Sequence, residues 1–423
     1  MAEIKPLRAV RFTEKAGSLS ELICPPYSRI RAEHKRELLT QNSRNLVQFE
    51  LWEKSCSEAA VEFEKWEKEG IFKQDSLPAV YIYEDEYKIH GQKRKVRGLL
   101  CLVKLEEYEN QVILPHEETL SKNRLDRLNL MKATFCNFSP VYSLYRDEER
   151  VTASRMELLA SAKPRYEFSE NGVTHRLWIV NDAIAISAFC EDFADRRLFI
   201  AEGQHRYEAA LQLRNWCREE QISGKGEQAD YVLMALTDMD NSDLALLPTH
   251  RLIHSLKDFD KATFLKHCEI YFDVIERDSI KDIETNLDAL YRQGKTAFAC
   301  YFGGQSWTLL ILKDHNATEQ FLSEKSERYR NLDAVVLQCL LLEQGLSIDE
   351  EDIAQQVHLS YTDSFEKGIQ SVENGFVQCA IFMNPARVKQ ICDLAMESEA
   401  LPFQSAHFYP QPAAGLAIYK MNP

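Results

Sequence analysis

Residues 198–210, which read Leu-Phe-Ile-Ala-Glu-Gly-Gln-His-Arg-Tyr-Glu-Ala-Ala, constrain the fold of this chain more than any other stretch. The apolar residues 198–201 predict a short buried strand, and residues 205–220 predict a helix. Gly203 lies between them and permits the tight turn that joins a strand directly to a helix. A domain that contains this stretch therefore combines strands with helices.

The same turn carries groups that bind anions. The first N–H groups of a helix have no partner within the helix, and the helix dipole favours negative charge there. His205 and Arg206 add donors suited to phosphate or carboxylate, and Glu202 adds a carboxylate at the edge. We predict that Gly203, His205 and Arg206 hold phosphate. We also expect Arg206→Ala to abolish ligand binding while leaving the melting temperature nearly unchanged.

Three further polar clusters interrupt ordinary core sequence. The cluster with the most varied chemistry contains His116, Glu117 and Lys122, which together can handle a charged substrate and a divalent metal. Residues 24–27 are also typical of a proline-stiffened turn with a packed tyrosine. Residues 248–251 are also typical of a surface turn. The three clusters are residues 24–27 (Cys-Pro-Pro-Tyr), residues 116–127 and residues 248–251 (Pro-Thr-His-Arg).

Strand-like and helix-like segments alternate along the chain. Residues 79–87 and 95–105 predict a hairpin, and the alternating residues 45–51 predict a half-buried strand. Residues 331–344 predict an apolar helix. This alternation favours the α+β class.

At 423 residues the chain is too long for one small core, so more than one domain is expected. The pattern of elements changes near residue 256. We predict a mixed-sheet N-terminal α+β domain over residues 1–254, which carries the ligand site, and a smaller α+β C-terminal domain over residues 255–423.

The formal net charge of −15 comes from 66 acidic and 51 basic side chains. Such a surface repels nucleic acid and anionic lipid, and no basic recognition helix stands out. No apolar run approaches the roughly 20 residues of a membrane span, and the first ten residues do not resemble a signal peptide. We therefore expect a cytoplasmic protein without nucleic-acid or membrane partners, whose oligomeric state the sequence leaves open.

Several familiar chemistries are disfavoured. The eleven cysteines are an odd number without a Cys-x-x-Cys pair, which indicates buried thiols rather than disulfides or zinc ligands. There is no Gly-x-Ser-x-Gly elbow, no Walker loop and no Gly-x-Gly-x-x-Gly fingerprint. Covalent catalysis by Cys24 with a histidine is a remote alternative.

A series of motifs, in a fixed order along nearly the whole chain, identifies a family that the chain resembles. It is the bacterial and archaeal domain-of-unknown-function family 1015, and the resemblance implies no established activity. The motifs are Ile-Cys-Pro-Pro-Tyr at 23–27, His-Glu-Glu-Thr-Leu-Ser-Lys at 116–122, Asp-Arg at 126–127, Asn-Phe-Ser-Pro at 137–140, Glu-Gly-Gln-His-Arg-Tyr-Glu-Ala-Ala at 202–210, Leu-Pro-Thr-His-Arg at 247–251, Asn-Pro at 384–385 and His-Phe-Tyr-Pro at 407–410.

The Glu-Gly-x-His-Arg turn is also similar, more distantly, to the glycine-arginine box of the ParB and sulfiredoxin superfamily. Members of that superfamily bind nucleotide at this kind of turn, and some are kinases that phosphorylate free serine. The similarity implies that Gly203, His205 and Arg206 hold phosphates and that Glu202 is a base or metal partner.

The chain departs from the family pattern at charged positions. The pattern has Asp-Gly-His-His-Arg where residues 202–206 read Glu-Gly-Gln-His-Arg, and it has an aspartate at the position of Ser28. Near the end, two lysines of the pattern are replaced by Gln404 and Gln411, and a threonine by Ala406. If those lysines bind phosphate in relatives, affinity falls here or the ligand differs.

The leading interpretation is a small-molecule kinase or other phosphotransferase that uses ATP, ADP or pyrophosphate, with Mg²⁺, and a small metabolite such as free serine as acceptor. Arg251 and Lys122 would help to hold phosphate. Glu202 or Glu117 would bind Mg²⁺ or accept the proton, and His116 would support them. The alternative is a non-catalytic ligand-binding or regulatory protein that has lost activity, so the sequence leaves open whether the chain is an enzyme.

Overall fold

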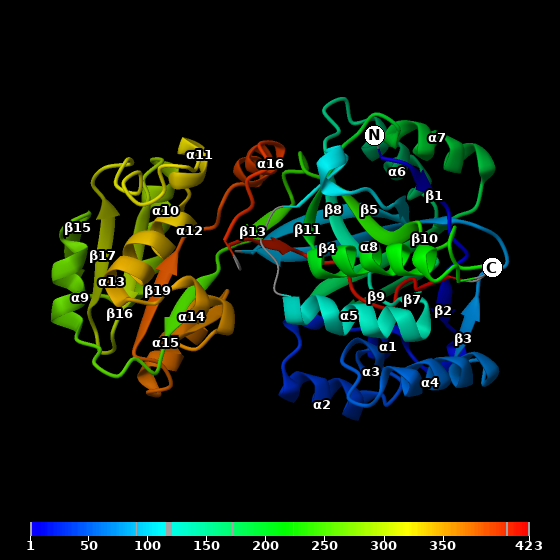
Figure 1. Cartoon of the computed structure of the whole chain (residues 1–423), viewed down its shortest axis with the longest axis horizontal. Helices are drawn as coiled ribbons and strands as arrows, with labels where there is room; N and C mark the ends of the chain where they lie inside the picture. Colours follow the sequence, from blue (N-terminus) through cyan, green and yellow to red (C-terminus); the bar gives the residue numbers. More distant parts are fainter. Residues whose placement is uncertain are drawn as a thin grey trace. The chain divides into compact units, whose positions relative to one another are not determined.

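A computed structural model describes residues 2–89, 91–115, 121–170, 172–222, 224–402 and 405–421, with the side chains of residues 121–123 and 354 left out. These residues form two compact units. Unit 1 consists of the described residues up to Ala245 together with residues 410–421, and unit 2 consists of those from Leu246 to Tyr409. Figure 1 labels their elements, and each unit is described by itself.

Unit 1 is built on a nine-stranded mixed sheet in the order β6-β11-β8-β12-β5-β4-β10-β9, with β1 paired to β5. Its strands are β1 (Ile4–Lys5), β4 (Val80–Ile89), β5 (Gln92–Lys104), β6 (Ile113–Leu114), β8 (Val141–Tyr145), β9 (Tyr166–Glu170), β10 (Val173–Val180), β11 (Leu198–Glu202) and β12 (Tyr231–Asp238). Two short pairs accompany it, β2 (Val10–Phe12) with β3 (Phe72–Gln74) and β7 (Cys136–Asn137) with β21 (Tyr419–Lys420).

The helices of unit 1 place the candidate site. Helix α8 packs on strands β8 and β12 of the sheet, and α5 lies beside α8 (Figure 1). The helices are α1 (Leu19–Leu22), α2 (Ala32–Gln41), α3 (Val47–Glu50), α4 (Cys56–Lys68), α5 (Ser121–Thr134), α6 (Val151–Leu159), α7 (Ala183–Phe193) and α8 (Gln204–Glu219).

Unit 2 contains a six-stranded antiparallel sheet in the order β15-β17-β16-β19-β14-β18, with a hydrophobic core on each of its faces. The strands are β14 (His250–Ile253), β15 (Phe272–Arg277), β16 (Ala297–Tyr301), β17 (Trp307–Leu312), β18 (Leu359–Thr362) and β19 (Cys379–Met383); β13 (Ala245–Leu247) pairs with β20 (His407–Tyr409). The helices are α9 (Lys261–Cys268), α10 (Ile283–Arg292), α11 (Glu327–Arg330), α12 (Asp333–Val336), the π-helix η5 (Leu337–Glu343), α13 (Gln344–Leu346), α14 (Glu350–Gln355), α15 (Phe365–Glu373) and α16 (Val388–Met396).

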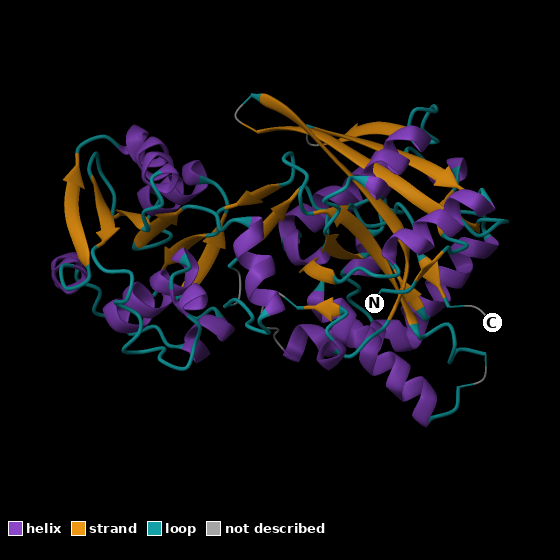
Figure 2. Cartoon of the chain, turned by 90° about the horizontal axis from the view of Figure 1, so that it is seen from above, coloured by secondary structure: helices purple, strands orange, loops and turns teal. Residues whose placement is uncertain are grey.

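The α+β prediction is confirmed at the level of a large mixed sheet with helices and smaller sheets. The predicted hairpin of residues 79–87 and 95–105 is also confirmed, because β4 and β5 pair antiparallel along their length (Figure 2). Within the described residues, no helix is both long enough and apolar enough to cross a membrane.

The predicted strand over residues 45–51 is wrong, because these residues form the short helix α3. The cause is the buried Asn45 side chain, whose Oδ1 accepts from the N–H of Val47 at 2.9 Å. Its Nδ2 donates to the carbonyl of Ile23 at 2.7 Å. Asparagine that bonds the backbone two residues on starts a turn, so a local polar contact overrides the alternating pattern.

The compact units also differ from the predicted limits of 1–254 and 255–423. Strand β14 pairs with β18 and β19, which places His250–Ile253 in the unit 2 sheet. At the other end, residues 410–421 return to unit 1, where Ala414 bridges Cys24 and Ile418 bridges Val10. Strand pairing across long sequence separations therefore sets these limits.

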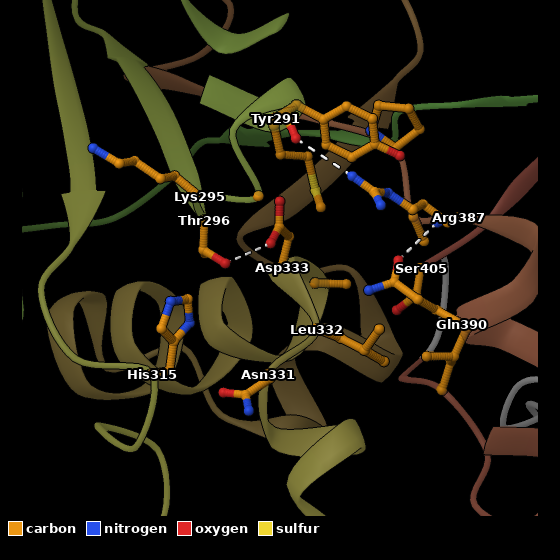
Figure 3. A pocket seen from close by; sticks show the side chains of 16 residues that line it. Tyr291, Lys295, Thr296, His315, Asn331, Leu332, Asp333, Arg387, Gln390 and Ser405 are labelled. Atoms are coloured by element: carbon orange, nitrogen blue, oxygen red, sulfur yellow. Dashed lines mark hydrogen bonds between the residues drawn. The ribbon is translucent and has the colours of Figure 1, made fainter. Parts of the chain in front are cut away.

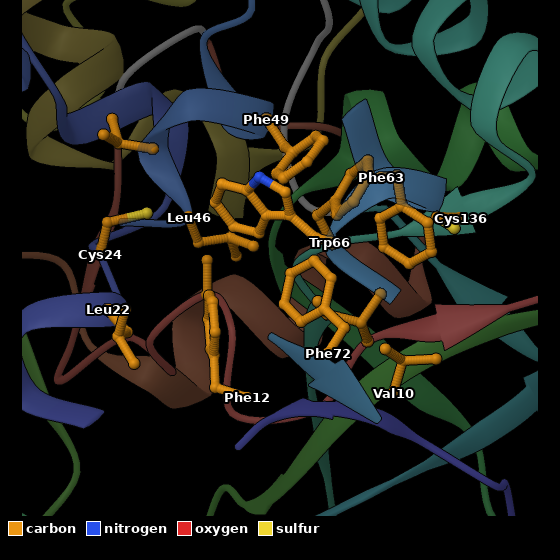
Figure 4. Packing of buried hydrophobic residues seen from close by; sticks show 14 of the residues in the cluster. Val10, Phe12, Leu22, Cys24, Leu46, Phe49, Phe63, Trp66, Phe72 and Cys136 are labelled. Atoms are coloured by element: carbon orange, nitrogen blue, oxygen red, sulfur yellow. The ribbon is translucent and has the colours of Figure 1, made fainter. Parts of the chain in front are cut away.

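The core beside α4 is rich in aromatic rings, as Figure 4 shows. Phe49 lies at its centre with no exposed surface. Its ring centroid is 5.0 Å from that of Trp66 in an edge-on arrangement, and 5.0 Å from that of Phe138 in a stacked one. Such pairs add to the stabilisation that burial of the rings already provides.

Phe49→Ala is expected to lower the free energy of unfolding by about 3–5 kcal/mol, because it leaves a cavity among these rings. Denaturant unfolding followed by tryptophan fluorescence measures the loss. Val61→Ala is the control, since Val61 is 68% exposed on the neighbouring α4 and its truncation should change stability by less than about 0.5 kcal/mol. Equal effects of the two substitutions would contradict the packing described here.

Candidate functional site

The strand, turn and helix predicted over residues 198–210 are present as β11, Gly203 and α8. A register shift between Ile200 and Glu202 in the pairing of β11 with β8 marks an irregularity at the end of the strand. Such bulges redirect side chains, often beside functional sites. Gly203 follows with φ 88° and ψ 25°, a conformation that favours glycine, and its carbonyl accepts the first helical bonds from the N–H groups of Arg206 and Tyr207.

The Arg206 guanidinium folds back over Gly203. A Cβ atom at position 203 would lie 2.6 Å from Nη2 of Arg206 and 2.8 Å from its Cζ. From Nη1, Arg206 donates to Oγ of Ser139 at 2.8 Å and to the carbonyl of Pro140. Arg206 therefore ties the turn to the segment that precedes β8. Because Arg206 is only 4% exposed and bonds the protein, Arg206→Ala is expected to lower the melting temperature, contrary to the expectation from the sequence.

Tyr27 joins the first predicted cluster to this turn. Its ring centroid lies 4.3 Å from Cζ of Arg127 on α5 and 6.0 Å from Cζ of Arg206. Arg127 in turn donates to the carbonyl of the buried Glu50 at 2.8 Å. We call Tyr27, Arg127 and Arg206 the arginine–tyrosine cluster. Burial raises the pKa of Tyr27, although the two arginines act to lower it, so the hydroxyl is protonated at neutral pH.

Glu202 receives hydrogen bonds from two segments that are distant in sequence. Oγ of Ser28 donates to its Oε1 at 3.3 Å, and Nε2 of Gln411 donates to its Oε2 at 3.1 Å. Ser28 and Gln411 are two of the positions where the chain departs from the family pattern. Both departures therefore lie on one carboxylate, which is held by neutral donors.

His205 is partly buried in the first turn of α8. Burial lowers the pKa of its imidazole and outweighs the opposing carboxylates of Glu208 and Glu202. At neutral pH the ring is therefore uncharged. It can donate one hydrogen bond to a phosphate, but it adds no positive charge to the turn.

The cluster at residues 116–127 is described in part. His116 and Glu117 lie outside the described residues, and so does the side chain of Lys122, whose backbone belongs to α5. Arg124 on the same helix pairs with Glu208 of α8, with Nη1 and Oε2 3.2 Å apart. The roles predicted for His116, Glu117 and Lys122 stay predictions.

Arg251 belongs to unit 2, where it lies on β14 and is 2% exposed. Its guanidinium Cζ is 5.1 Å from the ring centroid of Tyr361, and Nη1 donates to the carbonyl of Thr249. The neighbouring His250 is enclosed by apolar side chains, and burial lowers its pKa to about 3. A joint role of Arg251 with the unit 1 turn stays a prediction.

Metal and thiol chemistry receive no added support from the parts of the chain that are described. No group of three or more His, Cys, Asp or Glu side chains gathers there in a way that could hold a metal ion. Cys24 is fully buried, and burial raises the pKa of its thiol well above the ordinary value. A buried, protonated thiol is a poor nucleophile, which disfavours Cys24 as a covalent catalyst.

Sequence reasoning gave Tyr27, Ser28 and Gln411 no role at the turn, and it noted Arg127 only as a member of its cluster. The sequence signal that could have linked these residues to the turn is that their segments carry motifs, or departures from motifs, of the same family. A proline-stiffened turn can equally serve packing alone, so the motif could not reveal that Tyr27 meets two arginines.

Gly203→Ala is expected to destabilise unit 1 by more than the strain of a positive φ alone, because the new Cβ meets Arg206. Gly70→Ala is the matched control, since Gly70 has φ 70° and open space around its Cβ position. The measurement is the free energy of unfolding, where the excess should be about 1–3 kcal/mol. In an Arg206→Ala background the excess should disappear, and its persistence there would contradict the folded-back arginine.

Three of the solved structures that match this chain show how slight the similarity is. A conserved hypothetical protein from Pyrococcus furiosus is 12% identical with a TM-score of 0.36, and the match covers 73% of this chain and 92% of that one. A free serine kinase in complex with AMP is 10% identical with a TM-score of 0.36, covering 70% and 83%. C-terminally truncated SbnI from Staphylococcus aureus is 9% identical with a TM-score of 0.35, covering 75% and 86%.

No curated protein matches the chain in sequence. Residues 4–335, which include the turn at Gly203 and the arginine–tyrosine cluster, match the family model described as protein of unknown function DUF1015. The match spans most of the chain and confirms the family resemblance carried by the motifs. The chain belongs to the DUF1015 family.

Proposed function

We propose that unit 1 binds a phosphorylated ligand such as ATP, ADP or pyrophosphate at the Gly203 turn and transfers a phosphoryl group to a small metabolite. A free amino acid such as serine is one option for the acceptor. The observation that carries this proposal is the convergence of the α8 N-terminus, two arginines and the carboxylate of Glu202 at one turn. Phosphoryl transfer depends mainly on positioning and on neutralising phosphate charge, which such a set supplies.

The two arginines retain hydrogen-bonding capacity for a ligand. Each uses Nη1 for bonds to the protein, and neither Nη2 nor Nε has a hydrogen-bond partner among the residues described. A guanidinium offers five N–H donors in a plane and binds phosphate oxygens in pairs. Together with the positive end of the α8 dipole, the arginine–tyrosine cluster supports binding of a phosphate group.

Glu202 is the group best placed to accept a proton from the acceptor hydroxyl. Its carboxylate is oriented from two sides by Ser28 and Gln411, and oriented groups contribute more to proton transfer than mobile ones. Glu202 also fits a role as one oxygen ligand of Mg²⁺, which is usually held by one or two carboxylates and by substrate phosphates. Glu117 is the second carboxylate proposed for either role.

The alternative function is a binding or regulatory protein without turnover. It is favoured by the neutral side chains of Ser28 and Gln411 at positions where the family pattern carries charge. Such a protein would bind the phosphorylated ligand at the same turn and release no product. Turnover therefore distinguishes the two functions, whereas ligand binding does not.

The test begins with thermal shifts in ATP, ADP, pyrophosphate and free amino acids, each with and without Mg²⁺. A ligand at a hundredfold excess over its dissociation constant stabilises the native state by about 2.7 kcal/mol, which this assay detects. We expect a Mg²⁺-dependent shift with one phosphate compound, followed by product formation with an acceptor. No shift with any phosphate compound would overturn the proposal, and a shift without turnover would leave the alternative function.

Glu202→Gln should keep the nucleotide-dependent shift and reduce turnover by about 10²–10⁴-fold, the usual contribution of a general base. The amide preserves the size of the side chain and removes the proton acceptor. Glu219→Gln, on the exposed last turn of α8, is the matched control and should leave turnover unchanged. Full turnover in the Glu202 variant would exclude Glu202 as the base.

Gln411→Lys restores the residue of the family pattern next to Glu202. The ammonium would form an ion pair with the carboxylate and favour its charged form. If Glu202 is the base, the acid limb of the pH–rate profile should move to lower pH by about one unit or more. An acid limb at the same pH in both proteins would show that another group limits the reaction at low pH.

A further inference from the structure

Unit 2 contains a cavity of about 270 Å³ that the proposed function does not use, and its described lining residues all belong to unit 2 (Figure 3). Leu332, Ala334, Met383 and Leu401 give it buried apolar walls. Its volume lies just below the range of about 300–1,000 Å³ that is usual for ligand pockets, so it suits a small metabolite. We call it the unit 2 pocket.

One carboxylate oxygen in the wall of the unit 2 pocket has no donor among the residues described. Oδ1 of Asp333 accepts from Oγ1 of Thr296 at 2.8 Å, while Oδ2 accepts no hydrogen bond from any residue described. Oδ1 of Asn331 is buried and has no partner in the described part of the chain, but Figure 3 shows it away from the Asp333 carboxylate. A carboxylate oxygen that lines a cavity and has no protein donor can accept a hydrogen bond from a ligand, so Oδ2 of Asp333 calls for a ligand that donates.

The charge of Asp333 narrows the class of donor. Burial raises the pKa of its carboxyl to about 6, against the opposing effects of Thr296 and Arg387. At neutral pH the group is therefore mainly ionised, and it lines the cavity. A cationic donor such as a primary ammonium satisfies both the charge and the hydrogen bonds.

A cationic side chain, Arg387, also lines the pocket. Arg387 is exposed and stacks on Tyr291, with Cζ 4.8 Å from the ring centroid, and its Nη2 donates to the Tyr291 carbonyl at 3.4 Å. Nη1 of the same guanidinium makes no hydrogen bond to the residues described. Figure 3 shows Asp333 between Arg387 and His315, whereas Lys295 points away from Asp333. The pocket therefore offers a negative group inside and a positive group at its rim.

We infer that the unit 2 pocket binds a small α-amino acid with an apolar side chain. The ammonium would donate to Oδ2 of Asp333, and the carboxylate would accept from Arg387. The side chain would rest on the apolar wall that includes Met383 and Leu401. This inference does not depend on phosphate binding in unit 1.

The backbone next to the pocket adds independent support. Asp333 begins α12, which passes directly into the π-helix η5. Within η5, Nε2 of the Gln338 side chain donates to Oε1 of Glu343, five residues on, at 3.1 Å. π-Helical turns are rare and occur frequently at functional sites, where they adjust the residues around a ligand.

The test is isothermal titration of the full chain with L-leucine and two analogues that each lack one charged group. 4-Methylpentanoate has no amine, and 3-methylbutylamine has no carboxylate. We expect saturable binding of leucine, weaker binding of the amine and no detectable binding of the acid, because the buried contact is made by the ammonium. Absence of leucine binding, or equal binding of 4-methylpentanoate, would overturn the inference.

Asp333→Asn tests whether leucine binds in the unit 2 pocket, because the amide oxygen can still accept from Thr296 while the negative charge is removed. It should weaken leucine binding at least about tenfold, or by ~1.4 kcal/mol. Asp273→Asn, on the exposed face of the edge strand β15, is the matched control and should bind leucine normally. Arg387→Gln is a second variant on the rim and should weaken leucine binding while leaving that of 3-methylbutylamine unchanged.

Failure of this inference is distinguishable from failure of the proposed function. Leucine binding that survives Asp333→Asn but is lost in Glu202→Gln would assign the amino acid to unit 1 and overturn the unit 2 site. Loss in Asp333→Asn with unchanged nucleotide-dependent shifts would support the unit 2 site alone.

Discussion

The positive φ of Gly203 is the constraint on which the candidate site depends. It lets β11 end and α8 begin within one residue, and the missing side chain leaves room for the Arg206 guanidinium. That guanidinium then bonds Ser139 and Pro140, which fixes the turn against the sheet. Glycine is required twice over, by the backbone conformation and by the close approach of a charged side chain.

The carboxylate of Glu202 gives the departures from the family pattern a common physical meaning. Read along the sequence, Ser28 and Gln411 are unrelated losses of charge. In space both donate to Glu202, so an acidic and a basic position have become neutral around the same carboxylate. Removing one charge of each sign keeps the net charge beside Glu202 and changes how that residue is held. The site is thus altered as a unit, whether it serves catalysis or binding.

Local features of the chain were predictable where backbone geometry follows from neighbouring residues. The hairpin of β4 and β5 and the β11–Gly203–α8 turn were correctly predicted from periodicity and from glycine placement. Helix α3 was missed because the Asn45 side chain bonds the backbone there, a polar contact that hydrophobic alternation does not register. The limits of the units depended on residues 410–421 returning to unit 1, which no local pattern shows.

The sequence by itself determined the family, the α+β class and a strand–glycine–helix turn suited to an anion, because these depend on residues close together along the chain. Only the tertiary structure decided which side chains meet Glu202, since Ser28 and Gln411 lie 174 and 209 residues away from it. It also placed Tyr27 near two arginines and Asp333 in the wall of the unit 2 pocket. Contacts of this kind are set by how strands and helices pack, and packing depends on the shape and burial of many distant residues at once.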